Sequence, residues 1–398
     1  MIAGFSIATA QTHQHAISAP GDGQYNPFLA GDNRGGFYLA FIDRLNNQCN
    51  VMLRHSDDGV NFSAPVRVND RPGDATVRNE NPPKVIVGRQ GELYVTWANE
   101  RGKWKGNILF SRSLNGGKTF SPALTINSDG AGEPAGHAFQ SMAIDARGRI
   151  YIAWIDERNK QKEDPGAEIW LAVSTDRSKT FSRDRRILTD VCECCRTNLQ
   201  VDQAGNLYLS YRTVPRSGKM FRDVIVARSS DGGKTFMPVA VSDDKWEIAG
   251  CPVAGPSLTL NSSGHPALIW FMGGGERPGL YYATSSNHGK SFTQRQLLDP
   301  QQKIGKHSHS ATLADGRIFV AWDDASQKTF SVWGLLDSIT GLVRRSTEHE
   351  GVAYPVLALN KSIAVIAAME LSTHKVVTFS EDLSSFAKGK ERLKIGRN

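Results

Sequence analysis

The stretch Ser229-Ser230-Asp231-Gly232-Gly233-Lys234-Thr235-Phe236 is the clearest local signal in the sequence. An aspartate side chain accepts hydrogen bonds from backbone N–H groups across a tight turn, and glycine adopts the positive φ that such a turn needs. The aromatic residue at the end folds back and plugs the turn. The stretch therefore predicts a compact hairpin that joins two short strands.

Four related stretches occur at regular intervals along the chain. They run from His55 to Phe62, Ser113 to Phe120, Ser174 to Phe181 and Ser285 to Phe292. The third positions of the five copies, 57, 115, 176, 231 and 287, are separated by 58, 61, 55 and 56 residues. A regular period of this length indicates a protein built from repeated units.

A second pattern, a turn glycine followed by an apolar and aromatic strand, has the same period. Its glycines are Gly36, Gly91, Gly148, Gly205, Gly264 and Gly316, which lie 55, 57, 57, 59 and 52 residues apart. A seventh copy without glycine spans residues 362–368. Seven units of about 57 residues fill the 398-residue chain. We therefore predict an all-β, seven-bladed β-propeller as a single domain over residues 25–398, with six blades as the alternative.

The pattern S-x-D-x-G-x-T-F at residues 229–236 resembles the Asp box, or BNR repeat, of the sialidase-like propeller superfamily. Through the repeat, this resemblance covers nearly the whole chain. It implies four-stranded blades, each with the box in its outer hairpin, on the face away from the ligand. Asp57, Asp176 and Asp231 are therefore excluded as catalytic candidates. Sialidases of this superfamily have six blades, and the seven units here depart from that number.

Composition and charge narrow the classes of partner. The sequence has no run of 18 apolar residues, so we expect no membrane span. The net charge of +7 comes from basic residues spread along the chain, which argues against nucleic acid as a partner. We expect a monomer with a glycan or a small molecule as its ligand.

The N-terminal segment, residues 1–24, has two interpretations. Ala8-Thr9-Ala10 is similar to a signal-peptide cleavage site, although the segment lacks a positively charged start. The segment is then the remnant of a leader, and the alternative is a closing β-strand. We predict an exported protein, periplasmic or secreted, and keep a cytoplasmic location as the alternative.

Ligand sites of propellers lie at the channel mouth, on the loops that enter the innermost strands and on those that join the second and third strands. The entering loops carry many polar residues. We predict ligand binding by Arg78, Asn81, Gln140 and His307, and catalytic roles for Tyr354, Arg196, Glu133 and His137.

The resemblance to sialidases assigns roles to some of these residues. Sialidases clamp the substrate carboxylate with three arginines and use a tyrosine nucleophile polarised by a glutamate. Tyr354 is placed similarly to that nucleophile, Arg196 could be one clamp arginine, and the partner could be Glu133, Glu80 or Glu193. The first blade has Tyr25-Asn26-Pro27-Phe28 in place of an Arg-Ile-Pro motif, so the arginine triad is incomplete.

A polysaccharide lyase is an alternative enzyme class. Seven-bladed lyases remove a proton next to a uronate carboxylate with histidine or tyrosine, while arginine neutralises the carboxylate. His137, His307, Tyr354 and Arg196 suit these roles, and their spacing does not decide between the two classes.

Five cysteines occur, and four of them fall on the entering loops of two neighbouring blades. Cys192, Cys194 and Cys195 lie on one loop and Cys251 on the next, while Cys49 is separate. One interpretation is a disulfide between Cys251 and one of the three. Another is a copper or zinc site made by the four cysteines with His307 and His309, because thiolate and imidazole suit Cu(I) and Zn²⁺. The third interpretation is that the cysteines are free or redox-reactive thiols.

The sequence thus favours an exported propeller that binds a glycan or small ligand at its mouth, with glycoside hydrolase and lyase as candidate activities. Two alternatives belong to other classes. One is a periplasmic Cys/His protein that binds copper, and the other is a non-catalytic interaction scaffold.

Overall fold

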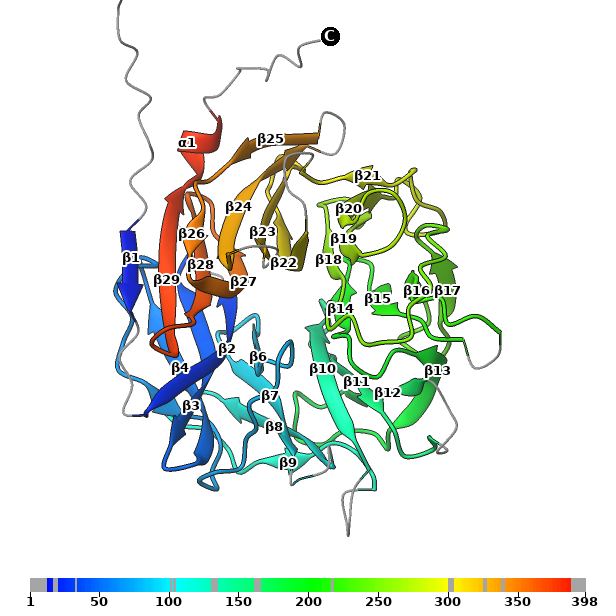
Figure 1. The fold of residues 1–398 in the computed structure, drawn as a ribbon. Helices are drawn as coiled ribbons and strands as arrows, with labels where there is room; N and C mark the ends of the chain where they lie inside the picture. Colours follow the sequence, from blue (N-terminus) through cyan, green and yellow to red (C-terminus); the bar gives the residue numbers. More distant parts are fainter. Residues whose placement is uncertain are drawn as a thin grey trace, which may run out of the picture.

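The computed structural model describes residues 13–16, 21–32, 34–100, 102, 105–129, 135–160, 166–215, 218–299, 304–324, 328–337 and 341–387. Seven antiparallel sheets form a ring around a central axis (Figure 1). The prediction of an all-β, seven-bladed propeller is confirmed. The described residues include one short helix, α1 (Leu383–Ala387), and none long and apolar enough to cross a membrane.

Each blade runs from an innermost strand at the channel to an outer strand. The first blade contains β2 (Gly23–Gly31), β3 (Phe37–Leu45), β4 (Gln48–Ser56) and β5 (Val66–Arg67), and the second β6 (Lys84–Val87), β7 (Leu93–Glu100), β8 (Gly106–Ser113) and β9 (Leu124–Thr125). The third contains β10 (His137–Ile144), β11 (Ile150–Asp156), β12 (Ala167–Ser174) and β13 (Arg185–Val191), and the fourth β14 (Asn198–Val201), β15 (Leu207–Arg212), β16 (Val224–Ser229) and β17 (Met237–Ala240).

The remaining three blades follow the same order. The fifth contains β18 (Ser257–Leu260), β19 (Pro266–Met272), β20 (Gly279–Thr284) and β21 (Gln296–Leu297). The sixth contains β22 (Gly305–Thr312), β23 (Ile318–Asp324), β24 (Phe330–Asp337) and β25 (Gly341–Arg345), with β26 (His349–Glu350) paired to β24. The seventh contains β27 (Val352–Leu359), β28 (Ile363–Glu370) and β29 (Lys375–Asp382), and β1 (His13–Ala16) is its outermost strand.

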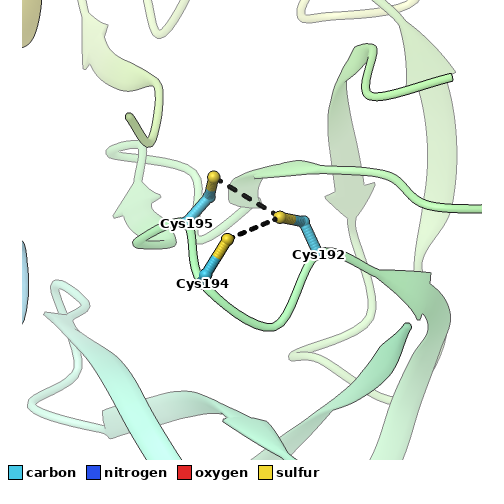
Figure 2. A group of neighbouring side chains, drawn as sticks. All are labelled: Cys192, Cys194 and Cys195. Carbon is cyan, nitrogen blue, oxygen red and sulfur yellow. Dashed lines mark hydrogen bonds between the residues drawn. The ribbon is translucent and has the colours of Figure 1, made fainter. Parts of the chain in front are cut away.

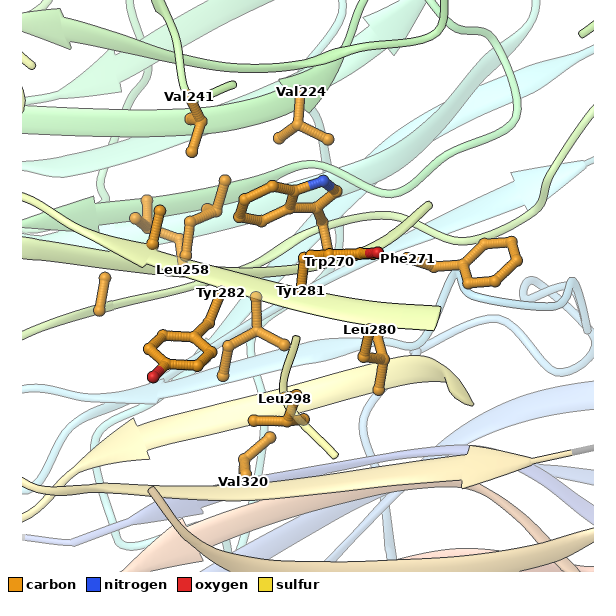
Figure 3. Packing of buried hydrophobic residues seen from close by; sticks show 14 of the residues in the cluster. Val224, Val241, Leu258, Trp270, Phe271, Leu280, Tyr281, Tyr282, Leu298 and Val320 are labelled. Carbon is orange, nitrogen blue, oxygen red and sulfur yellow. The ribbon is translucent and has the colours of Figure 1, made fainter. Parts of the chain in front are cut away.

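The core lies between neighbouring blades. The second strands of four blades carry tryptophans, Trp97, Trp154, Trp270 and Trp322, each at most 1% exposed. Trp270 packs in a cluster that draws residues from the fourth, fifth and sixth blades (Figure 3). Burying one such aromatic side chain contributes roughly 1.5–3 kcal/mol. The repeated aromatic position of the sequence thus forms the packing between blades.

The predicted turn hairpins are present, and their hydrogen bonds repeat. Asp231 accepts hydrogen bonds from the backbone N–H of Thr235 at 3.0 Å and from its hydroxyl at 2.6 Å, while the Ser229 hydroxyl accepts one from Gly233 N–H. Gly233 has φ 84°, which a residue with a side chain rarely adopts. Asp176, Asn115 and Asn287 accept the equivalent backbone bonds in their own hairpins.

The first hairpin requires a correction. Asp58, rather than Asp57, accepts the turn hydrogen bonds, from the backbone N–H groups of Val60 and Asn61. The Asp57 side chain is 97% exposed. The turn is one residue shorter here, since the Ser56 hydroxyl accepts from Gly59, three residues later rather than four.

Candidate functional site

The chain enters six of the seven blades through a residue with positive φ. These residues are Asn26, Glu80, Phe139, Val253, His307 and Tyr354, with φ between 43° and 61°. The innermost strands β2, β10, β22 and β27 also have register shifts at these positions. Such bulges redirect side chains and are common beside functional sites. The repeated irregularity marks the channel mouth.

Arg196 links three blades at this mouth. Its guanidinium forms an ion pair with Glu80 of the second blade and donates to the carbonyl of Ser308 in the sixth. The other Glu80 oxygen accepts the backbone N–H of Gly255 at 2.6 Å. The Glu80 side chain is fully buried, and Arg196 and this N–H group are the partners that compensate for its removal from water.

His307 and Tyr354 lie together beside this pair. The His307 Nδ1 lies 2.9 Å from both carboxylate oxygens of Asp323, and its Nε2 lies 3.0 Å from the Val253 carbonyl. The ring centroids of His307 and Tyr354 are 4.3 Å apart. Burial alone would lower the pKa of His307, but Asp323 and Glu80 outweigh it and raise the pKa. Burial, then Asp323 and Glu80, raises the pKa of Tyr354 to about 12.

Lys84 and His309 lie in the same region of the channel. The Lys84 ammonium lies 4.3 Å from the centre of the Phe28 ring, and His309 meets the same ring edge-on. Burial, then Arg196, lowers the pKa of Lys84 to about 7. Burial, then Arg196 and Lys84, lowers the pKa of His309 well below its usual value. His309 is therefore a neutral imidazole, and it accepts the Leu357 N–H.

A depression of about 310 Å³ is lined by Arg78 and Glu193 among others. Both residues are close in sequence to the residues described above, since Arg78 lies two residues before Glu80 and Glu193 lies three residues before Arg196. Glu157 and Lys160 also line it, and the Lys160 ammonium lies 3.7 Å from Glu157 and 3.8 Å from Glu193. Burial raises the pKa of Glu157 against the opposing effect of Lys160. Arg78 is paired with Glu100 at 2.7 Å.

Three other predicted site residues have structural partners. His137 is fully buried, with its Nε2 3.2 Å from Asp129 and 3.1 Å from Asp156. Burial would lower its pKa, but the two carboxylates raise it to about 9. The buried Asn81 accepts the Phe139 N–H, and Gln140 donates to the Pro82 carbonyl. Glu133 lies outside the described residues. Ligand or catalytic roles for these four residues stay predictions.

The cysteine loops meet as the sequence indicated. Cys194 and Cys251 form a disulfide between the fourth and fifth blades, as the disulfide interpretation predicted. The Cys192 sulfur lies 3.4 Å from those of Cys194 and Cys195 (Figure 2). Contact with Cys195, then Arg222, lowers the pKa of Cys192 to about 7 against the effect of burial.

The cysteines and the histidines of the predicted metal site do not lie in one group among the described residues. Cys192, Cys194 and Cys195 have sulfur atoms within 4.8 Å of one another, and no histidine of the described chain joins this group. His307 and His309 are instead hydrogen-bonded at the mouth, to Asp323 and to the Leu357 N–H. Because Cys194 is bonded to Cys251, the oxidised protein offers the thiols of Cys192 and Cys195 alone within this group.

Lys84, Glu157 and Asp323 were not among the predicted site residues. Glu157 follows strand β11, and Asp323 is the second-last residue of β23. Acidic residues recur near the ends of the second strands of several repeats, as Asp43, Glu100, Asp156 and Asp323. That recurrence in the sequence is the signal by which Glu157 and Asp323 could have been predicted. Lys84 begins β6, and only the fold places it beside Arg196.

Comparison with known proteins places the chain among repeat propellers. Residues 46–362 match the family model of the BNR repeat-like domain. No curated protein sequence matches the chain significantly.

Several solved structures have a similar fold. A protein of unknown function from Dyadobacter fermentans has 13% identity and a TM-score of 0.56, with 94% of this chain and 99% of that chain covered. A polysaccharide lyase, the PL25 ulvan lyase, has 12% identity and a TM-score of 0.59, with 94% and 99% covered. The Hadza microbial sialidase Hz136 has 15% identity and a TM-score of 0.52, with 88% and 77% covered. At these identities the likeness concerns the fold alone.

Proposed function

The chain belongs to the BNR repeat-like domain family, and from that premise we propose that it binds a carboxylate-bearing saccharide at the channel mouth and acts on a glycosidic bond there. The observation that carries this proposal is Arg196, whose side chain is 11% exposed and is held by groups from two other blades. The sialidase and lyase folds named above support carbohydrate as the class of ligand.

The chemistry of Arg196 suits a carboxylate. A guanidinium offers five N–H donors in a fixed plane, and Glu80 and Ser308 engage two of its nitrogens. The remaining donors can bind a carboxylate in the geometry that arginine prefers. Lys84 lies in the same part of the channel, and because its pKa is lowered to about 7, a carboxylate bound there would favour its charged form. An acidic sugar is therefore favoured over a neutral one.

Glu157 is our proposed proton donor. A general acid for glycosidic cleavage needs a carboxyl group whose pKa is raised, and burial in the depression gives Glu157 that property. Tyr354, the nucleophile expected from the resemblance to sialidases, has a pKa raised to about 12, so its phenol stays protonated near neutral pH. We therefore assign Tyr354 to sugar contact rather than to nucleophilic attack.

Binding is tested by calorimetry with acidic and neutral oligosaccharides of equal length. We expect Arg196→Met to weaken binding of the acidic sugars by about 10- to 100-fold, since hydrogen bonds to a charged group contribute roughly 1.5–3 kcal/mol. Arg89→Met is the matched control, because the exposed Arg89 follows the far end of β6. Equal affinity for acidic and neutral sugars, or an unchanged Arg196→Met variant, would contradict the proposal.

Turnover is tested separately with fluorogenic glycosides and with uronate polymers, whose elimination products absorb in the ultraviolet. Hydrolysis that falls sharply in Glu157→Gln but persists in Tyr354→Phe supports the assigned roles. Formation of unsaturated uronates would instead favour the lyase alternative. Binding without turnover would leave a non-catalytic glycan-binding scaffold.

A further inference from the structure

The disulfide Cys194–Cys251 has a free thiol beside it. The sulfur of Cys192 lies 3.4 Å from that of Cys194, and dashed lines in Figure 2 join it to the sulfurs of both Cys194 and Cys195. Cys192 is fully buried, whereas Cys251 is exposed. One partner of the disulfide thus faces an internal thiol, and the other faces solvent.

The surroundings of Cys192 suit a nucleophilic sulfur. The Arg222 guanidinium approaches the Cys192 sulfur at 2.9 Å, and a cation at this distance favours the thiolate form. Thiol–disulfide exchange proceeds by attack of a thiolate on one disulfide sulfur while the other sulfur leaves. Cys194 is the near sulfur, so Cys251 is the leaving group.

We propose that Cys192, Cys194 and Cys251 form a thiol–disulfide exchange site that controls the channel mouth. The Cys192 thiolate bonds to the Cys194 sulfur, the Cys194–Cys251 bond breaks, and its electron pair leaves on the Cys251 sulfur. Cys251 takes up a proton from water, and Cys192 has given its own proton to solvent. One disulfide and one thiol exist before and after, so no oxidant or reductant is needed.

The exchange affects the channel mouth through the loop that the disulfide at Cys251 holds in place. Two residues after Cys251, the Val253 carbonyl contacts His307, and the Gly255 N–H donates to Glu80. On the other loop, Arg196 follows Cys194 by two residues. Release of Cys251 frees the loop that holds His307 and Glu80. This regulatory part of the proposal rests on the proposed saccharide function, because it expects lower affinity after exchange.

Trapping with N-ethylmaleimide tests the exchange in the full chain without reductant. The reagent captures Cys251 once it is released, and non-reducing peptide mapping by mass spectrometry identifies the linkage. We expect wild type to accumulate Cys251 adducts together with a Cys192–Cys194 disulfide. In Cys192→Ser the adduct at Cys251 should fall to background, and in the control Cys195→Ser it should persist.

Two outcomes overturn the exchange site: a wild-type protein in which Cys251 stays unlabelled, and equal labelling of Cys251 in Cys192→Ser. The disulfide linkage mapped in the wild-type protein tests the exchange even if a variant fails to fold. Melting curves show whether each variant is folded. Saccharide affinity is measured before and after trapping. Unchanged affinity overturns the regulatory part, whereas no binding by untreated protein contradicts the proposed function and leaves the exchange site standing.

Discussion

Charged side chains near the mouth are held in buried pairs. Arg196 pairs with Glu80, and His307 with Asp323. His137 lies between Asp129 and Asp156. Removing one member of such a pair leaves the other charge buried and typically costs about 3–5 kcal/mol. These pairs fix side-chain positions before any ligand arrives, which is the condition for a preorganised site.

His137 gives the protein a pH-dependent stability. The two carboxylates raise its pKa from 6.5 to about 9, so between these values the folded state binds more protons than the unfolded state. The stabilisation is complete below about pH 6.5 and is lost as the pH rises to about 9, with a size of about 3 kcal/mol. Lys84, whose pKa is lowered to about 7, titrates in the same range with the opposite effect, so the difference in urea denaturation between wild type and a His137 variant measures the contribution of His137.

In His137→Asn this part of the pH dependence should disappear. The matched control is His374→Asn, because His374 is exposed and asparagine tolerates its positive φ of 50°. We expect the control to follow the wild-type slope. A His137→Asn variant whose free energy of unfolding changes with pH in the same way as that of wild type would show that His137 is not the group responsible.

At the scale of the element, the turn hairpins are the most predictable part of the molecule. Their hydrogen bonds are local, so serine, aspartate and glycine at fixed spacing are sufficient to place them. The predicted position of the first hairpin was wrong by one residue, because Asp57 and Asp58 are adjacent in the sequence. The useful signal was Ser56, which lies two residues before Asp58, as Ser229 lies before Asp231.

This correction predicts different effects for two neighbouring aspartates. Asp58→Ala removes the acceptor for Val60 and Asn61 and should lower the free energy of unfolding by about 1 kcal/mol. Asp57→Ala is the control and should change it little, since the side chain is 97% exposed. Denaturant titration compares the two variants. Equal losses in both, or a larger loss in Asp57→Ala, would contradict the assigned register.

At the scale of the whole molecule, the repeat predicted the blades but not the contacts between their loops. Arg196 meets Glu80 across 116 residues and Ser308 across 112. A period describes what each blade shares, whereas these contacts depend on side chains that differ from blade to blade. Candidate residues could therefore be placed at the mouth, while their partners required the three-dimensional arrangement.

One short strand joins the two ends of the described chain in the ring. Strand β1 pairs with β29 over four residues, from His13 opposite Ser380 to Ala16 opposite Val377, and so joins the two ends of the described chain in one blade. Without β1, β29 becomes an exposed strand edge, and the backbone hydrogen bonds of the pair are lost. At about 0.5 kcal/mol for each residue, removal should lower the free energy of unfolding by about 2 kcal/mol.

Two truncations separate this role from that of the preceding residues. Deletion of residues 1–16 removes β1, while deletion of residues 1–12 leaves it in place and is the control. Thermal and urea unfolding should show a loss in the first variant and little change in the second. An exposed strand edge also promotes association between copies, so the first variant should form oligomers in light scattering. If both truncations match the full chain, β1 contributes nothing to closure, and packing between blades alone holds the ring.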